Sequence, residues 1–184
     1  QSPINHIKLK HKEFIDTMYS YFGLENPNYA KKIKFIPLIF GGIYTIDFYI
    51  IINDFYERDF YKCSKANFGK LELENVVFHE SAHHLHYQYH QVNNSKNKFD
   101  SWTIELLINY ATIFYLKKKG MEDHLINMQK HAPEAWDLYK NLSSESQLRK
   151  LLNASEANVL DTYFRFLGNN HPYLIGRQEA INEE

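Results

Sequence analysis

The part of this sequence best suited to chemistry is the pentapeptide His79-Glu80-Ser81-Ala82-His83. Residues four apart on an α-helix lie about 40° apart around the axis and one turn along it, so the two imidazoles would stand side by side. Glu80 would lie about 100° round the helix from His79, where its carboxylate can reach a water molecule on a metal held by the imidazoles. The pentapeptide therefore predicts a zinc site with Glu80 as general base.

A catalytic zinc ion needs a third protein ligand and an open position for water. Cys63 is the only cysteine, so histidines and carboxylates must supply the ligands. The metzincin pattern requires Gly and His three and six residues after the second histidine, and here His86 and Tyr89 stand in those places. The metzincin alternative therefore fails. His86 and His90 continue the histidine stripe along the helix and remain rival ligands.

Through the pentapeptide and the later segment Ser-Trp-Thr-Ile-Glu-Leu-Leu-Ile-Asn-Tyr, residues 101–110, the chain resembles the gluzincin metallopeptidases, the thermolysin-like group. The resemblance covers about residues 71–116. In that family a Glu on a following helix is the third zinc ligand, and Glu105 stands 22 residues after His83. The resemblance thus implies a Zn²⁺ cofactor bound by His79, His83 and Glu105.

The surroundings of Glu105 carry two further expectations. Its neighbours are apolar, which predicts a buried side chain, and an unpaired buried carboxylate is costly. In the family an acid four residues after this Glu often orients a zinc-binding histidine. Here the residue is Asn109, whose side-chain oxygen can accept an imidazole N–H but carries no charge.

The resemblance also implies a hydrogen-bond donor, supplied from near the C-terminus, that stabilises the oxyanion of the transition state. The candidates are His171 and Tyr173, which follow the Gly-Asn-Asn turn at 168–170. We therefore expect Glu80, His171 and Tyr173 as the catalytic residues.

Hydrophobic spacing and turn residues indicate the elements that must position these groups. A helix is expected over 5–22, and the β-branched run from 34 to 55 reads as two strands that Gly41-Gly42 separates and that could pair as a hairpin. The motif helix should run from Leu71 to about His90, with a loop over 91–98 and a buried helix from Trp102 to Leu116. Shorter helices are expected at 121–130, 133–142, 145–152 and 154–167.

These elements predict an α+β fold, a zincin-like two-lobed domain that occupies residues 1–184. The N-terminal lobe, about 1–91, would hold a small sheet and the motif helix, and the C-terminal lobe, about 92–184, would be mostly helical. Zinc would lie in the cleft between them. An extended peptide would add along the outer strand of the sheet, somewhere within 36–54.

Composition narrows the partners. The chain has 184 residues, of which 44% are hydrophobic and 16% aromatic, which suits a folded domain. A net charge of −1 with scattered lysines argues against a nucleic-acid partner. Pro37, the glycine pair and Asp47 interrupt the longest apolar stretch and argue against a membrane span. The start at Gln1 rather than Met slightly favours a secreted or cell-envelope protein. Nothing in the sequence indicates an oligomeric state.

The sequence therefore predicts a zinc metallopeptidase, either an endopeptidase or an aminopeptidase-type hydrolase, that acts on a peptide or protein substrate. Glu80 would take a proton from the attacking water and pass it to the leaving amine. The alternative is an inactive or latent zincin-fold domain that works as a binding module, with the motif kept as scaffold or the cleft blocked by another segment.

Overall fold

The computed structural model describes residues 2–45, 47–61, 68–93, 101–141 and 163. They form a mixed α+β structure that is mostly helical and has one small sheet, which confirms the α+β class. The strands are β1 (Lys32–Ile36), β2 (Gly42–Tyr44) and β3 (Tyr49–Asn53). The helices are α1 (Pro3–Tyr21), α2 (Phe55–Asp59), α3 (Phe68–Asn93), α4 (Ser101–Lys119), α5 (Glu122–His131) and α6 (Pro133–Asn141).

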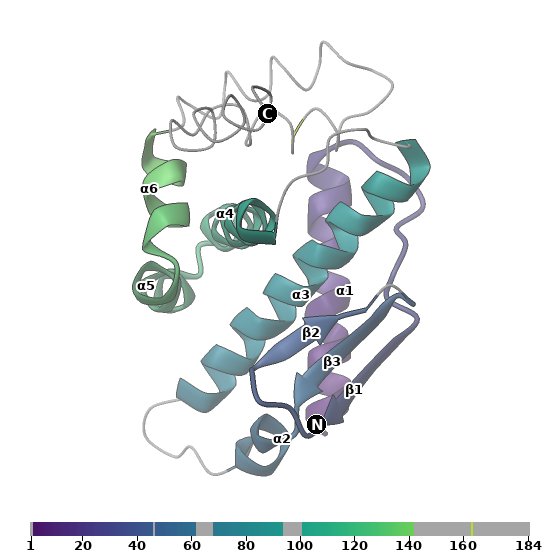
Figure 1. Cartoon of the computed structure of the whole chain (residues 1–184), viewed down its shortest axis with the longest axis vertical. Coiled ribbons are helices and arrows are strands. Elements are labelled where there is room, and N and C mark those ends of the chain that lie inside the picture. The colour runs from purple at the N-terminus through teal and green to yellow at the C-terminus, as the bar shows by residue number, and fades with distance from the viewer. Residues whose placement is uncertain (1, 46, 62–67, 94–100, 142–162, 164–184) are drawn as a thin grey trace, which may run out of the picture.

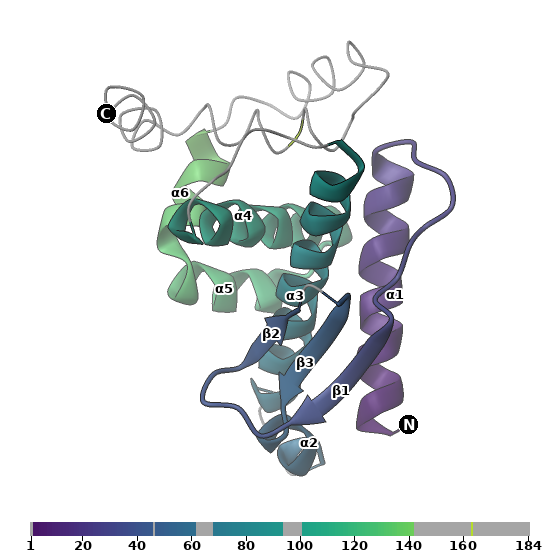
Figure 2. The same cartoon turned by 45° about the vertical axis from the view of Figure 1, so that its right-hand side comes forward.

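Helix α3, which carries the pentapeptide, runs through the middle of the molecule (Figure 1). Helix α1 and the sheet lie on one side of α3, and α4, α5 and α6 lie on the other (Figures 1 and 2). Because both of its sides are covered, α3 buries apolar residues around much of its circumference, from Leu73 to Leu85. The pentapeptide is therefore held on a rigid element that the rest of the fold surrounds.

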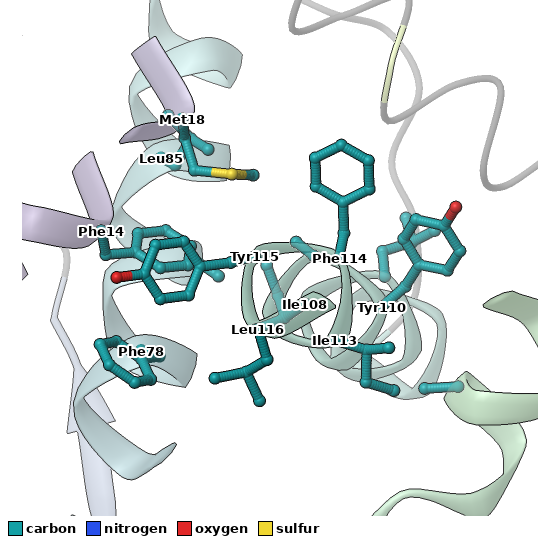
Figure 3. Close-up of a cluster of buried hydrophobic side chains, with 14 of the residues drawn as sticks. Phe14, Met18, Phe78, Leu85, Ile108, Tyr110, Ile113, Phe114, Tyr115 and Leu116 are labelled. Carbon is teal, nitrogen blue, oxygen red and sulfur yellow. The ribbon is translucent and has the colours of Figure 1, made fainter. Parts of the chain in front are cut away.

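The main hydrophobic core joins α1, α3 and α4 (Figure 3). At its centre the Tyr115 ring of α4 lies 4.7 Å from the Phe14 ring of α1 and 4.8 Å from the Phe78 ring of α3, measured between centroids. Phe78 immediately precedes His79, and Tyr115 is on the helix that carries Glu105. Aromatic packing thus fixes the spacing between the two helices that supply the candidate site.

The sheet has the order β1-β3-β2, with β1 parallel and β2 antiparallel to β3. The predicted hairpin across Gly41-Gly42 is therefore wrong, because β1 and β2 both pair with β3 and not with each other. The cause is Asn53: its side-chain N–H groups donate to the carbonyls of Leu38 and Phe40, at 2.8 and 2.9 Å. These bonds hold the segment between β1 and β2 against the end of β3, so that segment does not form a tight turn.

Most predicted helices are found with shifted ends. The motif helix begins at Phe68 and continues to Asn93, so residues 91–93 are helical and not part of the expected loop. The next helix runs over Ser101–Lys119, α5 and α6 correspond to the segments 121–130 and 133–142, and the short α2 was not expected. The helices expected at 145–152 and 154–167 lie outside the described residues, except for Tyr163, which is helical.

Among the helices of the described residues, none has both the length and the apolar character needed to cross a lipid bilayer.

Candidate metal centre

Helices α3 and α4 bring His79, His83 and Glu105 together. The Nε2 atom of His79 lies 3.1 Å from Oε2 of Glu105, and the Nε2 atom of His83 lies 2.9 Å from Oε1 of the same carboxylate. One ligand atom from each of the three residues can be chosen so that all lie within 4.8 Å of one another. Within the described ranges, no other set of three His, Cys, Asp or Glu side chains is gathered so closely.

Asn109 fixes the tautomer of His79. Its Oδ1 atom lies 2.8 Å from Nδ1 of His79, and because an amide oxygen only accepts hydrogen bonds, Nδ1 must carry the proton. The lone pair of a neutral His79 is then on Nε2, the atom that faces Glu105. Asn109 and Glu105 are four residues apart on α4, so one face of that helix supplies both contacts.

The donor set and its spacing fit a zinc ion. Two imidazole nitrogens and one carboxylate are common ligands of catalytic Zn²⁺, and ligands about 2.1 Å from a tetrahedral metal are about 3.4 Å apart. The separations of 3.1 and 2.9 Å from Glu105 to His79 and His83 are slightly below that value. Glu105 would need to move away from each imidazole by only a few tenths of an ångström to reach the spacing of zinc ligands.

Glu105 differs from its sequence expectation in one respect. Its apolar neighbours predicted burial, but 52% of its side chain is exposed. Leu106, Leu107 and Ile108 are buried on the other faces of α4, while Glu105 points towards α3 and solvent. The carboxylate therefore lies at an open position beside the imidazoles, where a substrate can approach.

Electrostatics couple Glu105 to the imidazoles. Although partial burial opposes ionisation, the contacts with His79 and His83 hold the pKa of Glu105 well below its usual range. Burial likewise opposes protonation of His79, but the contact with Glu105 outweighs it and raises the pKa of that imidazole. Glu105 is therefore an anion, as a metal ligand must be.

Glu80 lies beside this cluster and is almost fully buried. Burial raises the pKa of its carboxyl above the ordinary value, with the imidazoles of His79 and His83 opposing that rise and Glu105 adding to it. A raised pKa makes a carboxylate a stronger base, which favours the uptake of a proton from water. This property is the one required of the predicted general base.

His84, which follows His83 on α3, has its own hydrogen-bond partners away from Glu105. His84 donates from Nε2 to the Asn28 carbonyl at 2.9 Å, so its Nδ1 accepts from the Tyr44 hydroxyl at 2.8 Å. Burial lowers the pKa of His84 to about 4, so its ring is neutral and both its nitrogens are engaged. His86 is buried, and the side chain of His90 lies outside the described residues. His171 and Tyr173 also lie outside them.

Ser81, inside the pentapeptide, anchors α3 to α1. The backbone N–H of Ala30 donates to Nε2 of His11 at 2.9 Å, so Nδ1 of that ring carries the proton and donates to the Ser81 hydroxyl at 2.7 Å. Ser81 in turn donates to the Val77 carbonyl at 2.6 Å. The two bonds at Ser81 are buried and the bond from Ala30 is partly buried, so both ring nitrogens of His11 and the Ser81 hydroxyl have partners.

A pocket of about 290 Å³ opens beside His79, Glu80 and Asn109. Its floor is α3, and one wall is the glycine pair before and within β2. A Cβ atom on Gly42 would lie 2.8 Å from Val76 Cγ1, 3.2 Å from the Ile51 carbonyl oxygen and 3.3 Å from Glu80 Cγ. Glycine is therefore needed here so that β2 can approach Glu80.

The sequence reading missed the opposite wall, which α5 supplies through Asn127, Met128 and His131. With His124 these residues follow the spacing i, i+3, i+4, i+7 of one helix face, which is the signal that could have marked them. It also missed a buried contact beyond this wall. There Glu74 lies between two imidazoles, 3.6 Å from Nε2 of both His6 and His124.

Comparisons of the chain with protein families, with curated proteins and with solved structures found no match.

Proposed function

We propose that the chain is a zinc-dependent metallopeptidase of the gluzincin type, with the two parts on either side of α3 as the lobes of a zincin-like domain. The observation that carries the proposal is that His79, His83 and Glu105 come together from two helices, with the buried carboxyl of Glu80 next to them. Two features that a bare histidine pair does not require accompany them: the tautomer set by Asn109 and the pocket beside Glu80.

His79, His83 and Glu105 would hold the zinc, with Asn109 keeping the His79 ring oriented. A Zn²⁺ ion bound there supplies Lewis-acid polarisation of a carbonyl and lowers the pKa of water to near 7. Glu80 would accept a proton on its carboxylate from the attacking water and deliver it to the amine that leaves. Its raised pKa favours the first of these steps.

The position of β2 supports a peptide as substrate. β2 is an edge strand, because it pairs with β3 and the described residues place no strand on its other side. It lies on the side of the sheet towards α5, while β1 lies near α1 (Figure 2). An extended peptide that pairs with the free edge of β2 would run past Gly42 and so past Glu80.

The test measures bound zinc and peptide cleavage together in three proteins: the native chain, Glu80→Gln and Glu134→Gln. Glu134 is an exposed carboxylate on α6 and serves as the matched control. We expect one zinc per chain in all three, with cleavage in the native and Glu134→Gln proteins. Glu80→Gln should lose cleavage by a factor of about 100 or more.

Two outcomes contradict the proposal. A native chain that binds no zinc would leave the His-His-Glu cluster as an ion-pair network. A native chain that binds zinc but cleaves nothing in a broad peptide library, before and after limited proteolysis, would favour the alternative function of a peptide-binding module. A rise in activity after limited proteolysis would instead identify a latent peptidase.

A further inference from the structure

Beyond the metal centre, α3 places a second carboxylate on the same face as Glu80. Glu72, Val76 and Glu80 are spaced four residues apart, so they form one stripe along the helix, and all three line the pocket. Eight residues of helix separate the two carboxylates by about 12 Å along the axis. The pocket therefore has the proposed catalytic base near one end and a separate acid further along.

The walls of this pocket combine apolar and polar side chains, and Glu72 and Glu80 are the two carboxylates among the residues that line it. Tyr56, Val76, Met128 and Ala132 supply hydrocarbon and aromatic surface, Asn75, Asn127 and His131 add polar surface, and none of the described residues that line the pocket is a lysine or arginine. In the part of the chain that the structure describes, no basic side chain forms an ion pair with Glu72, whereas most other acids on α1 and α3 have a Lys or His partner. A partly apolar pocket with a carboxylate at the end away from Glu80 suits a long aliphatic side chain with a cationic end.

We propose that this pocket selects a lysine or arginine side chain of the substrate, at one of the two residues that flank the cleaved bond. The inference rests on the proposed peptidase function and deepens it by naming the substrate class. The aliphatic stem would pack against Val76 and Met128, and the cationic group would pair with Glu72. Such a pair would give Glu72 the cationic partner that no described lysine or arginine in the pocket supplies.

Length supports this assignment. A lysine side chain extends about 6 Å from Cα to its nitrogen, and the side chain of Glu72 reaches about 4 Å from its own Cα. With a contact of about 3 Å between them, these lengths add to about 13 Å, so a substrate residue held near Glu80 can reach Glu72, which lies about 12 Å away along α3. Serine or asparagine would fall short of Glu72.

Other side chains fit less well. Leucine or methionine would fill the apolar part but place hydrocarbon against the carboxylate of Glu72, which removes water from a charge without replacing it. Aspartate or glutamate would meet both Glu72 and Glu80, and like charges at this range repel. Glutamine has the length of glutamate, so it is shorter than lysine and also lacks the charge, although its amide can donate to Glu72. The order of preference is therefore Lys or Arg first, then Gln and Met, with acids last.

The first experiment sequences the products that the native chain releases from a complex peptide library. We expect Lys and Arg to be enriched at one position flanking the cut. In Glu72→Gln this preference should fall about fivefold, the value of one partly exposed ion pair, and in Glu72→Lys it should shift to Asp and Glu. Glu134→Lys, on the exposed face of α6, should keep the native profile.

A second experiment measures binding and does not need turnover. Zinc-loaded Glu80→Gln is titrated with fluorescent hexapeptide pools, each fixed at one central position as Lys, Arg, Met, Gln or Glu and mixed elsewhere. We expect the Lys and Arg pools to bind about fivefold more tightly than Met or Gln, with Glu weakest, and Glu72→Gln in the same background to remove the difference.

The two experiments separate the failure of each proposal. Cleavage without a basic preference, or a basic preference that Glu72→Gln leaves unchanged, overturns the specificity inference and leaves the peptidase standing. No cleavage, together with tighter binding of the Lys and Arg pools that depends on Glu72, overturns the peptidase and keeps the pocket assignment. Equal binding of all pools overturns the pocket assignment. Thermal unfolding of the Glu72 variants near the native temperature shows that each result comes from the folded chain.

Discussion

The two faces of α3 use histidine in opposite ways. On the face towards α1 and the sheet, His84 engages both ring nitrogens, with Asn28 and Tyr44, and the His11 ring that faces α3 is equally satisfied by Ala30 and Ser81. On the face towards α4, His79 uses Nδ1 for Asn109 and turns Nε2 to the half-exposed carboxylate of Glu105. Completed hydrogen bonding marks a structural imidazole, whereas a nitrogen directed at an open carboxylate marks a candidate ligand.

The largest expected effect separates the neighbours His83 and His84. His83→Gln removes one of the three proposed zinc ligands and should weaken zinc binding by more than a factor of about 100, which is the most that loss of a hydrogen-bond partner behind a ligand usually costs. His84→Gln should lower stability but keep one zinc per folded chain, because His84 does not face Glu105. Metal content and zinc titration of the purified proteins measure both. Loss of zinc from folded His84→Gln would break the contrast between the two faces.

A smaller effect is expected at Asn109. Asn109→Ala leaves all three ligands but frees the His79 ring, and zinc affinity should fall by a factor of about 10 to 100. Asn109→Asp restores an acceptor and adds a negative charge, so its affinity should equal or exceed that of the native chain. Competition with a chelator of known strength measures the three affinities. Equal affinities in all three proteins would show that Asn109 does not orient the ligand.

The smallest expected effect is a pH dependence of the free energy of unfolding, and it comes from His11 on the side of α3 that faces α1. Burial, with the nearby His84, lowers the pKa of His11 to about 3, from an ordinary value of 6.5. The unfolded chain binds a proton on His11 below pH 6.5 and the folded chain does not, so the free energy of unfolding falls as pH drops from 6.5 towards 3. The contribution is at most about 1.4 kcal/mol per pH unit.

Urea unfolding of the native chain and of His11→Gln at pH 8, 6 and 5 isolates this contribution. The variant should be less stable at pH 8 by about 1–3 kcal/mol, because buried hydrogen bonds are lost, and its stability should fall less steeply below pH 6.5. An identical pH slope in the two proteins would show that the His11 ring is not held neutral.

The sequence was most informative where the relevant spacing is local. Because His79, Glu80 and His83 lie within one helical turn and a half, their relative placement follows from helix geometry alone. Glu105 and Asn109 also share one helical face, but which face of α4 meets α3 depends on packing between Phe78 and Tyr115. The resemblance to gluzincins supplied that long-range pairing, and the apolar neighbours of Glu105 gave a misleading indication of burial.

Features that depend on tertiary packing escaped the sequence reading. The glycine pair was interpreted as a turn, yet Gly42 is a strand residue whose missing side chain admits Val76 and Glu80. The central place of β3 depends on the contacts of Asn53 with carbonyl groups more than ten residues earlier. In the sequence Glu72 looks like an ordinary acid on a helix surface. Its place in a pocket depends on the packing of α5, which lines the same pocket.

Residues of the candidate site and of the core are interleaved along α3, and this arrangement determines how the site responds to heating. Phe78, Ser81 and Ala82 are buried in contacts with the surrounding elements, and they alternate along the helix with His79, Glu80 and His83. No stretch of this turn can loosen without also releasing core contacts, so local opening of the site needs nearly the free energy of global unfolding. The centre should therefore keep its geometry up to the melting transition and lose it in the same cooperative step.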